Sequence, residues 1–208
     1  MILGASSGPA GDLLTVTRGL CLLWIVFALD IALTVVMPAE PALSGANPLA
    51  GGWLSLRLGL RPHEPWGLIG IPCAPFLHAG LGHLAANCLA LFVCGWLALK
   101  GGRSTALTAV VLAILVGGLL TWIIGRPGTV HIGASGVVFG LVGVLLGNAL
   151  FRKGCLPILV ALPVLLLYGA SLASMLPWRS PQGMSWEMHL GGFIGGFCTS
   201  FALRGRKD

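Results

Sequence analysis

Hydrophobic residues follow one another in six long runs along the chain, separated by short polar or glycine-rich breaks. The runs cover residues 18–37, 81–99, 105–124, 135–151, 156–176 and 186–203. Runs of about 20 apolar residues are typical of helices that cross a bilayer, where every backbone polar group needs a partner within the protein. The pattern therefore predicts an all-α fold: a polytopic membrane protein with a bundle of six transmembrane helices.

The long connection between the first two runs has a different composition. Residues 38–80 are rich in proline and glycine, but they also carry several leucines, two tryptophans and two arginines. Such a mixture is typical of short helices in the membrane interface, with tryptophan at headgroup depth. We expect a short tail over residues 1–17, a membrane domain over 18–203 with this large interfacial first loop, and a basic tail over 204–208.

Lysine and arginine gather on one side of the predicted membrane domain. If six spans alternate, the side that holds both termini carries Arg18, Lys100, Arg103, Arg152, Lys153, Arg204, Arg206 and Lys207. The other side carries Arg57, Arg61, Arg126 and Arg179. Because cytoplasmic loops hold an excess of basic residues, we predict a plasma-membrane protein with both termini in the cytoplasm. The runs that start at 81, 135 and 186 then all begin at the outer face.

The composition supports a membrane setting and narrows the partners. Hydrophobic residues make up 56% of the chain and charged residues 9%, whereas a soluble protein carries about a quarter charged residues. The net charge of +6 comes without a basic patch interleaved with aromatic residues, so we expect the lipid bilayer, and no nucleic acid, as a partner. We also expect no metal and no cofactor, because no residue cluster has ligand spacing and no glycine-rich loop follows a predicted strand.

Two of the runs that begin at the outer face carry groups suited to chemistry. One opens with Gly133-Ala134-Ser135-Gly136, and the other carries His189 about one turn from its start. Glycine stripes continue along both, at 136, 140, 143 and 147 and at 191, 192, 195 and 196. Membrane helices associate through such small residues, which let two backbones approach closely. The pattern predicts that these helices touch and that Ser135 lies near His189.

A serine beside a histidine suits acyl transfer. The hydroxyl becomes a competent nucleophile when a neutral imidazole takes its proton and later delivers it to the leaving amine. The developing oxyanion needs donors, which the Ser135 N–H, the Asn87 amide and the His83 ring can supply. Glu187 lies about 200° round the helix from His189 and should not orient its ring. Asp30, in the first run, is a remoter candidate for a third member, and we predict a Ser-His dyad.

These residues together resemble the rhomboid family of intramembrane serine proteases. Three pieces carry the resemblance: Gly133-Ala134-Ser135-Gly136 is similar to the family's Gly-x-Ser-Gly nucleophile motif, His189-Leu190-Gly191-Gly192 to its His-x-Gly-Gly segment on the sixth span, and Phe76-Leu77-His78 with His83 and Asn87 to its paired histidines and His-x-x-x-Asn. The resemblance covers residues 18–203, and the three pieces occur in the family's order.

The resemblance implies an activity and a set of roles. It implies a serine endopeptidase that cuts membrane-anchored proteins within or near their transmembrane segments through an acyl-enzyme, with the active site toward the outer face. Ser135 would be the nucleophile and His189 the general base. His83 and Asn87 would line the oxyanion hole and, with Ser135 and Gly133, form the substrate-binding set.

Two further residues match supporting positions of the family. Phe139 matches an aromatic residue that packs against the catalytic histidine, and His78 would tie down the end of the first loop. The chain departs from the family at Trp66-Gly67, where an arginine often follows the tryptophan. That departure concerns the anchoring of the first loop rather than the dyad.

Two other classes of function were weighed against the protease. A non-catalytic rhomboid-like protein that binds and escorts transmembrane segments would keep the fold but lose the serine or the histidine, and both are present here. A haem-binding electron carrier needs two histidines well apart on one helix facing two on another, and the five histidines form no such ladder. Asp30 receives no role, His63 and His131 are expected to be solvated, and the substrate and oligomeric state are not specified.

Overall fold

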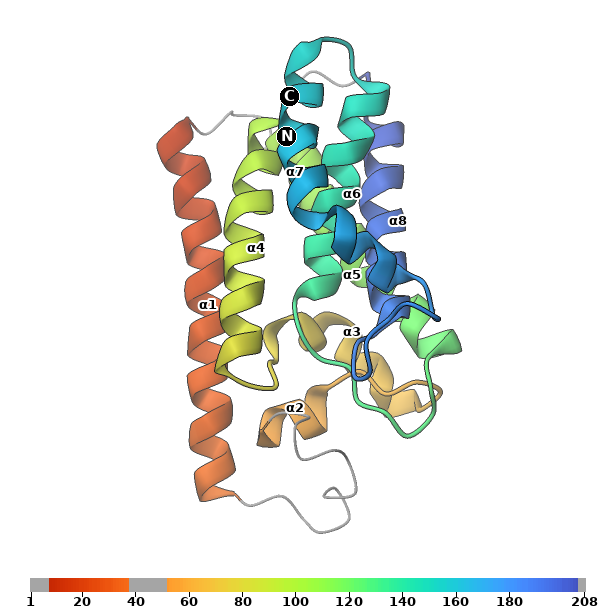
Figure 1. Ribbon diagram of the computed structural model, residues 1–208. Helices are drawn as coiled ribbons and strands as arrows, with labels where there is room; N and C mark the ends of the chain where they lie inside the picture. The colour runs from red at the N-terminus through yellow and green to blue at the C-terminus, as the bar shows by residue number, and fades with distance from the viewer. Residues whose placement is uncertain (1–7, 38–51, 206–208) are drawn as a thin grey trace.

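The computed structural model describes residues 8–37 and 52–205 of the chain. Six long helices form the bundle: α1 (Pro9–Val36), α4 (Leu81–Lys100), α5 (Arg103–Ile124), α6 (Ser135–Phe151), α7 (Cys155–Leu172) and α8 (Trp186–Ala202). Shorter helices connect them: α2 (Trp53–Leu58), α3 (Gly70–Cys73) and the 3-10 turns Pro65–Ile69, Ala74–Phe76 and Ala173–Met175. Within the described ranges there is no β-strand, so the predicted all-α class is confirmed (Figure 1).

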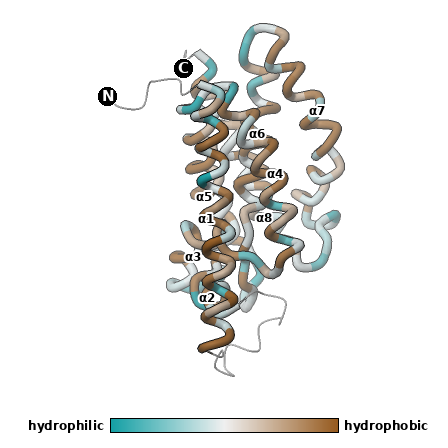
Figure 2. Tube along the Cα trace, turned by 90° about the vertical axis from the view of Figure 1, so that its left-hand side faces the viewer, coloured by the Kyte–Doolittle hydropathy of each residue, from teal (hydrophilic) through white to brown (hydrophobic). Residues whose placement is uncertain are grey.

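Four of these helices are long and apolar enough to cross a membrane. They are α1, α4, α5, and α7 together with the 3-10 turn that follows it. Hydrophobic residues run along the length of the long helices (Figure 2). α6 is equally apolar but has 17 residues, and α8 also has 17. The fold is therefore a helical, multi-pass membrane bundle, while six complete spans remain a prediction.

The first helix starts earlier than the hydrophobic run suggests. α1 begins at Pro9, whereas the run begins at 18. Proline suits the first helical position, and Asp12 in the first turn faces the positive end of the helix dipole. Lys100 Nζ lies 3.4 Å from Asp12 Oδ2, which ties the start of α1 to the end of α4. Residues before position 18 thus belong to the bundle from Pro9 onward.

Glycines bring α6 and α8 into backbone contact, as their stripes in the sequence predict. α6 packs most extensively against α8, which also packs along α5. A Cβ atom at Gly143 would collide with the Phe193 carbonyl, and one at Gly196 would collide with the Gly140 carbonyl. Backbone atoms cannot move aside as a flexible side chain can, so these positions accept no larger residue. α6 is buried along most of its length as a result.

Hydrogen bonds fasten the first loop to the bundle at several points. Asp30 is buried in α1 and accepts hydrogen bonds from the Leu54 N–H at 2.6 Å and the Ser55 hydroxyl at 2.7 Å. Farther along, Leu60 and His131 exchange backbone hydrogen bonds of 3.0 and 2.9 Å. Asp30 therefore anchors α2, a role that the sequence did not suggest. The predicted interfacial segment over residues 38–51 lies outside the described residues.

His131 is not the solvated residue that its loop position suggests. Its backbone pairs with Leu60, its ring nitrogen Nε2 lies 2.8 Å from the Thr129 hydroxyl, and its side chain is half-buried. Burial lowers the pKa of His131 to about 4. His63 does lie exposed, with its ring bonded to the Gly125 carbonyl at 3.0 Å.

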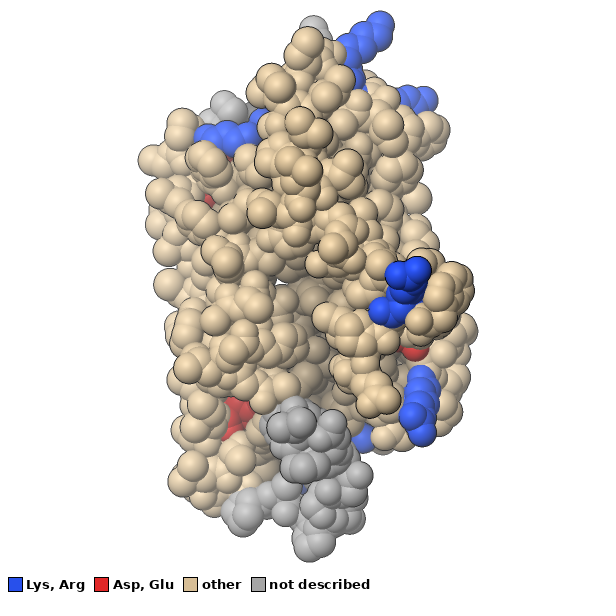
Figure 3. All heavy atoms as spheres, viewed as in Figure 1, with Lys and Arg blue, Asp and Glu red and all other residues tan. Residues whose placement is uncertain are grey.

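Charged residues are sparse over the face seen in Figure 3, and uncharged residues form most of it. At the end of the bundle near the start of α1, Arg152 donates to the Gly101 carbonyl at 2.6 Å and to the Thr105 hydroxyl at 3.0 Å. Lys100 and Arg103 lie at this same end, where Lys100 pairs with Asp12. We call it the basic end of the bundle.

Candidate active site

Ser135 is the first residue of α6, and the segment before it fixes its position. Gly133 has a φ of +115°, a left-handed conformation that glycine adopts far more readily than other residues. Its N–H donates to the Ala74 carbonyl at 2.9 Å, so the turn before α4 holds the start of α6 in place. The Ser135 side chain is half-buried inside the bundle rather than at its surface.

His189 lies one turn into α8 and meets Ser135 across the contact between the two helices. Its Nε2 atom is 2.9 Å from Ser135 Oγ, which is hydrogen-bonding distance. The side chain is 2% exposed. The Phe139 ring stacks on the imidazole, with centroids 4.3 Å apart and planes inclined by 20°. The imidazole is thus held between a ring on α6 and the serine at the start of that helix.

A second serine contacts the other nitrogen of the same imidazole. Ser174, in the turn after α7, has its Oγ 3.1 Å from His189 Nδ1, and it donates its own proton to the Ser171 carbonyl at 2.7 Å. A hydroxyl has one proton to give, so Ser174 can only accept from Nδ1–H. A neutral ring with its proton on Nδ1 has its lone pair on Nε2, facing Ser135. This is the tautomer that general-base catalysis requires.

Sequence reasoning did not find Ser174. It lies 15 residues before His189, beyond any helical spacing, and serine in an apolar run commonly bonds to its own backbone. Its proximity to His189 comes from the 3-10 turn that follows α7, Ala173–Met175. Glu187, by contrast, accepts a hydrogen bond from Ser185 at 3.2 Å, as expected for a side chain that points away from His189.

Asn87 and His83 bring possible hydrogen-bond donors close to the backbone that precedes Ser135. The Asn87 side chain is buried, and its Nδ2 group has no hydrogen-bond partner among the described residues. Buried polar groups are nearly always paired, so an unpaired amide beside a serine needs an explanation such as a ligand. A Cβ atom on Gly133 would lie 3.6 Å from Asn87 Nδ2 and 2.7 Å from His83 Nε2. Both side chains therefore face the backbone that precedes Ser135.

His78 lies behind this donor set. Its ring is 2% exposed and packs edge-on against the His83 ring at 5.1 Å. Burial, with a smaller contribution from the nearby His83, lowers the pKa of His78 to about 4. His78 is therefore a neutral, buried group in the loop before α4, behind the ring of His83. Among the described residues no cluster of three or more histidine, cysteine or acidic side chains could hold a metal.

The fold and the site together define a multi-pass helical membrane protein with a serine-histidine pair inside its bundle. The family model described as Rhomboid domain matches residues 62–206, and the chain belongs to the rhomboid family. It is 38% identical over 163 residues to Uncharacterized protein Rv1337 of Mycobacterium tuberculosis (strain ATCC 25618 / H37Rv), covering 76% of this chain and 68% of that protein.

Other relatives extend beyond mycobacteria. RHOMBOID-like protein 1 of Arabidopsis thaliana is 30% identical over 173 residues, which cover 76% of this chain and 41% of that protein. RHOMBOID-like protein 6, mitochondrial, from the same plant is 28% identical over 162 residues, covering 73% of this chain and 48% of that protein. No solved structure matches the chain. The resemblance on which the predicted roles depend is thus confirmed at the level of the family.

Proposed function

We propose that the protein is an intramembrane serine endopeptidase that cleaves proteins anchored by a transmembrane segment. The observation that carries the proposal is the 2.9 Å contact between Ser135 Oγ and His189 Nε2. Ser174 supports a catalytic role for this contact, because it accepts from Nδ1–H of His189 and so leaves Nε2 as the acceptor. A serine that only packs or caps a helix would need neither a buried imidazole nor a fixed tautomer.

The first half of the reaction forms an acyl-enzyme. Ser135 Oγ attacks the carbonyl carbon of the scissile peptide bond while His189 Nε2 takes the hydroxyl proton. The carbonyl oxygen becomes an oxyanion, and the carbon–nitrogen bond then breaks as the imidazolium gives its proton to the leaving amine. The substrate's N-terminal part remains bound to Ser135 as an ester.

The second half uses water in place of the amine. His189 takes a proton from a water molecule as the oxygen attacks the ester carbon, and Ser135 recovers its proton when the ester bond breaks. Ser174 keeps the ring in place throughout and stabilises the imidazolium by accepting from Nδ1–H. Phe139 limits the ring to one plane by stacking on it, which supports the same geometry.

Asn87 and His83 are proposed to stabilise the oxyanion, together with the Ser135 N–H. The first N–H groups of a helix have no partner inside the helix, so the start of α6 offers a donor there. The unpaired Asn87 amide supplies another. Preorganised donors of this kind contribute about 3 kcal/mol each to lowering the barrier. Gly133 leaves room for His83 and Asn87 to approach, because any side chain there would meet the His83 ring.

The proposed setting is the plasma membrane, with both termini in the cytoplasm and six spans. In this topology α4, α6 and α8 all begin near the outer face, and Ser135 and His189 lie within the first turns of their helices. The basic end of the bundle then faces the cytoplasm, in keeping with the distribution of lysine and arginine. Substrates would be membrane proteins whose transmembrane segments reach the outer half of the bilayer.

The test is cleavage of a transmembrane reporter by the full chain in lipid vesicles. Wild type should cut it, whereas Ser135→Ala and His189→Ala should each lose several orders of magnitude in kcat, because the two residues act as a unit. Cutting by Ser135→Ala at the wild-type rate would exclude this nucleophile. If wild type binds transmembrane segments and cuts none of a reporter panel, the escort function replaces the protease.

A further inference from the structure

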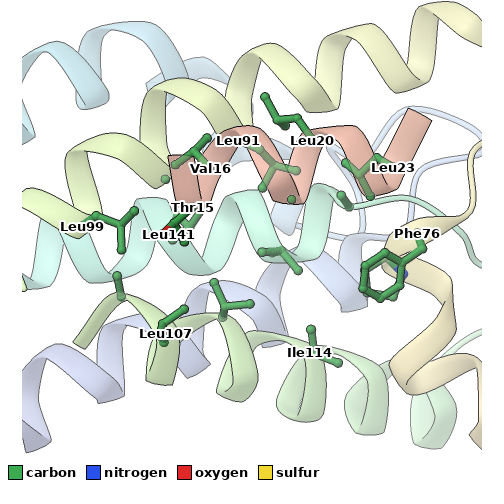
Figure 4. A pocket seen from close by; sticks show the side chains of 17 residues that line it. Thr15, Val16, Leu20, Leu23, Phe76, Leu91, Leu99, Leu107, Ile114 and Leu141 are labelled. Atoms are coloured by element: carbon green, nitrogen blue, oxygen red, sulfur yellow. The ribbon is translucent and has the colours of Figure 1, made fainter. Parts of the chain in front are cut away.

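A cavity lies inside the bundle, on a different side of α6 from the Ser135 and His189 side chains. It has a volume of about 210 Å³ and lies between α1, α4, α5 and α6 (Figure 4). α6 lines it with Val137 and Leu141, which lie on a different face from Ser135 and Phe139, and Ala134 lines it just before that helix begins. The exposed residues Gly19 on α1 and Leu107 on α5 lie at its edge, so it opens toward the surface between these two helices. We call it the α1–α5 groove.

The lining of the groove is suited to hydrocarbon. Its walls are apolar side chains and glycines, apart from one hydroxyl, that of Thr15. Thr15 donates to the Gly11 carbonyl at 2.8 Å and accepts from Arg103 at 2.9 Å, so the hydroxyl is already satisfied. Apolar cavities of comparable size stay dry and take up hydrocarbon ligands rather than water. The helices that flank the opening carry exposed leucines toward the membrane.

The groove runs along α1 for a length that suits a flexible chain. Thr15 and Leu23 mark its two ends on α1, and eight residues of helix span about 12 Å. An extended segment of one acyl chain can lie along that length between the four helices.

Charge at one end indicates the kind of lipid. The groove ends beside Thr15, where Arg103 donates its hydrogen bond, and Lys100 lies at the same end of the bundle. Among the described residues at this end, Lys100, Arg103 and Arg152 carry positive charge and Asp12 carries negative charge, so the net charge there is positive. Basic residues at a membrane surface attract anionic headgroups. The structure thus offers an apolar channel with a positively charged end.

We propose that the α1–α5 groove binds one acyl chain of an anionic phospholipid from the leaflet at the basic end, with the headgroup beside Arg103. This site is independent of the proposed protease activity. Its far end is lined by Phe76 and Ala134, the neighbour of Ser135, so a bound chain touches the segment that positions the serine.

The test is photo-cross-linking in vesicles of phosphatidylcholine that contain phosphatidylglycerol with a diazirine on one acyl chain. Wild type should be labelled mainly on peptides that line the groove, in α1 and α5. Gly95→Leu should lower this labelling about tenfold, because the new side chain occupies room for several methylenes. A Cβ there meets Val16 and Leu141 at 3.7 and 3.9 Å, ordinary contacts, so the variant should fold.

Matched variants make the outcome unambiguous. Gly169→Leu makes the same change on α7, outside the groove, and should leave labelling unchanged. Gly19→Leu, where an added Cβ meets nothing within 4 Å, is a second filling variant if Gly95→Leu misfolds. Arg103→Gln should remove the preference for phosphatidylglycerol over a phosphatidylcholine probe with the same chain.

Three results would contradict the proposal in whole or in part. Labelling spread evenly over the exposed faces of α1, α5 and α7, and insensitive to Gly95→Leu and Gly19→Leu, would show that the groove holds no chain. Equal labelling by both headgroups in wild type would remove the anionic specificity. Labelling of the groove by a photo-reactive reporter helix, in place of lipid, would identify a substrate as the occupant and contradict the proposal.

Discussion

Replacing Ser174 with alanine isolates the contact that fixes the tautomer of His189. The hydroxyl lies 3.1 Å from Nδ1, and the imidazole is 2% exposed, so water cannot easily take its place. A buried donor left without a partner costs about 1–3 kcal/mol. If the ring keeps its proton on Nδ1, that cost falls on the catalytic conformation and lowers the rate about 5- to 150-fold. If the proton moves to Nε2, His189 cannot act as the general base toward Ser135 as long as Nε2 is protonated.

The assay measures kcat and KM for reporter cleavage in vesicles. We expect kcat to fall and KM to remain, because Ser174 contacts His189 and not the proposed substrate donors. Ser171→Ala is the matched control: Ser174 donates to the Ser171 backbone carbonyl, which alanine retains, and the Ser171 side chain is exposed. Ser174→Thr keeps the hydroxyl and should restore most of the activity.

A spectroscopic measurement separates positioning from general damage. The ¹⁵N resonances of His189 should report a proton on Nδ1 in wild type and in Ser171→Ala, and a shift toward Nε2–H in Ser174→Ala. Ser174 does not fix the tautomer if Ser174→Ala retains kcat within about twofold, a change of about 0.4 kcal/mol, and leaves the ¹⁵N resonances unchanged.

Three further predictions concern the scaffold, each checked by thermal unfolding in detergent. Gly196→Ala should destabilise the protein by more than about 3 kcal/mol, because the added Cβ collides with a backbone carbonyl on α6, while Gly169→Ala should be tolerated; equal melting of the two would contradict the packing. Asp30→Asn should cost about 2 kcal/mol by weakening its charge-assisted bonds to Leu54 and Ser55, and an unchanged melting temperature would exclude this anchor. The pKa of His78 is lowered from 6.5 to about 4 in the folded protein. Between these two pH values the unfolded chain therefore binds a proton at His78 and the folded chain does not. Its stability contribution is complete above pH 6.5 and falls by about 3 kcal/mol as the pH drops to 4; His78→Phe should flatten this dependence, and an unchanged slope would contradict the assignment.

The bundle could be predicted largely from the hydrophobic pattern because lipid imposes a simple rule on the backbone. Runs of apolar residues marked the long helices, and the glycine stripes identified α6 and α8 as neighbours, since backbone contact leaves no room for a Cβ atom. The start of α1 was missed because the segment from Pro9 to Thr17 is mixed in polarity. Its helix is favoured by proline at the first position, by Asp12 in the first turn and by the contact between Asp12 and Lys100, none of which hydropathy registers.

The residues of the candidate site were predictable where a polar side chain lies inside an apolar helix, because burying such a side chain in a membrane costs free energy. A histidine or an asparagine inside an apolar helix needs a partner, so His189 and Asn87 stood out at once. Ser174 and Asp30 did not, because a turn after α7 and a loop after α1 bring their partners, His189 and Ser55, to them, and no helical spacing or glycine stripe marks these contacts. Such contacts depend on how turns and loops close over the bundle. The spacing of residues along the chain does not indicate how these turns and loops close.

Covalent labelling of Ser135 tests the central proposal most directly, because it needs no knowledge of the substrate. The full chain in vesicles would be treated with a fluorophosphonate probe, which reacts with activated serine nucleophiles, and the modified residue identified by mass spectrometry. We expect an adduct on Ser135 that is lost in Ser135→Ala and strongly reduced in His189→Ala. An adduct on Ser174 or another serine, or equal labelling of Ser135 without the imidazole, would contradict it.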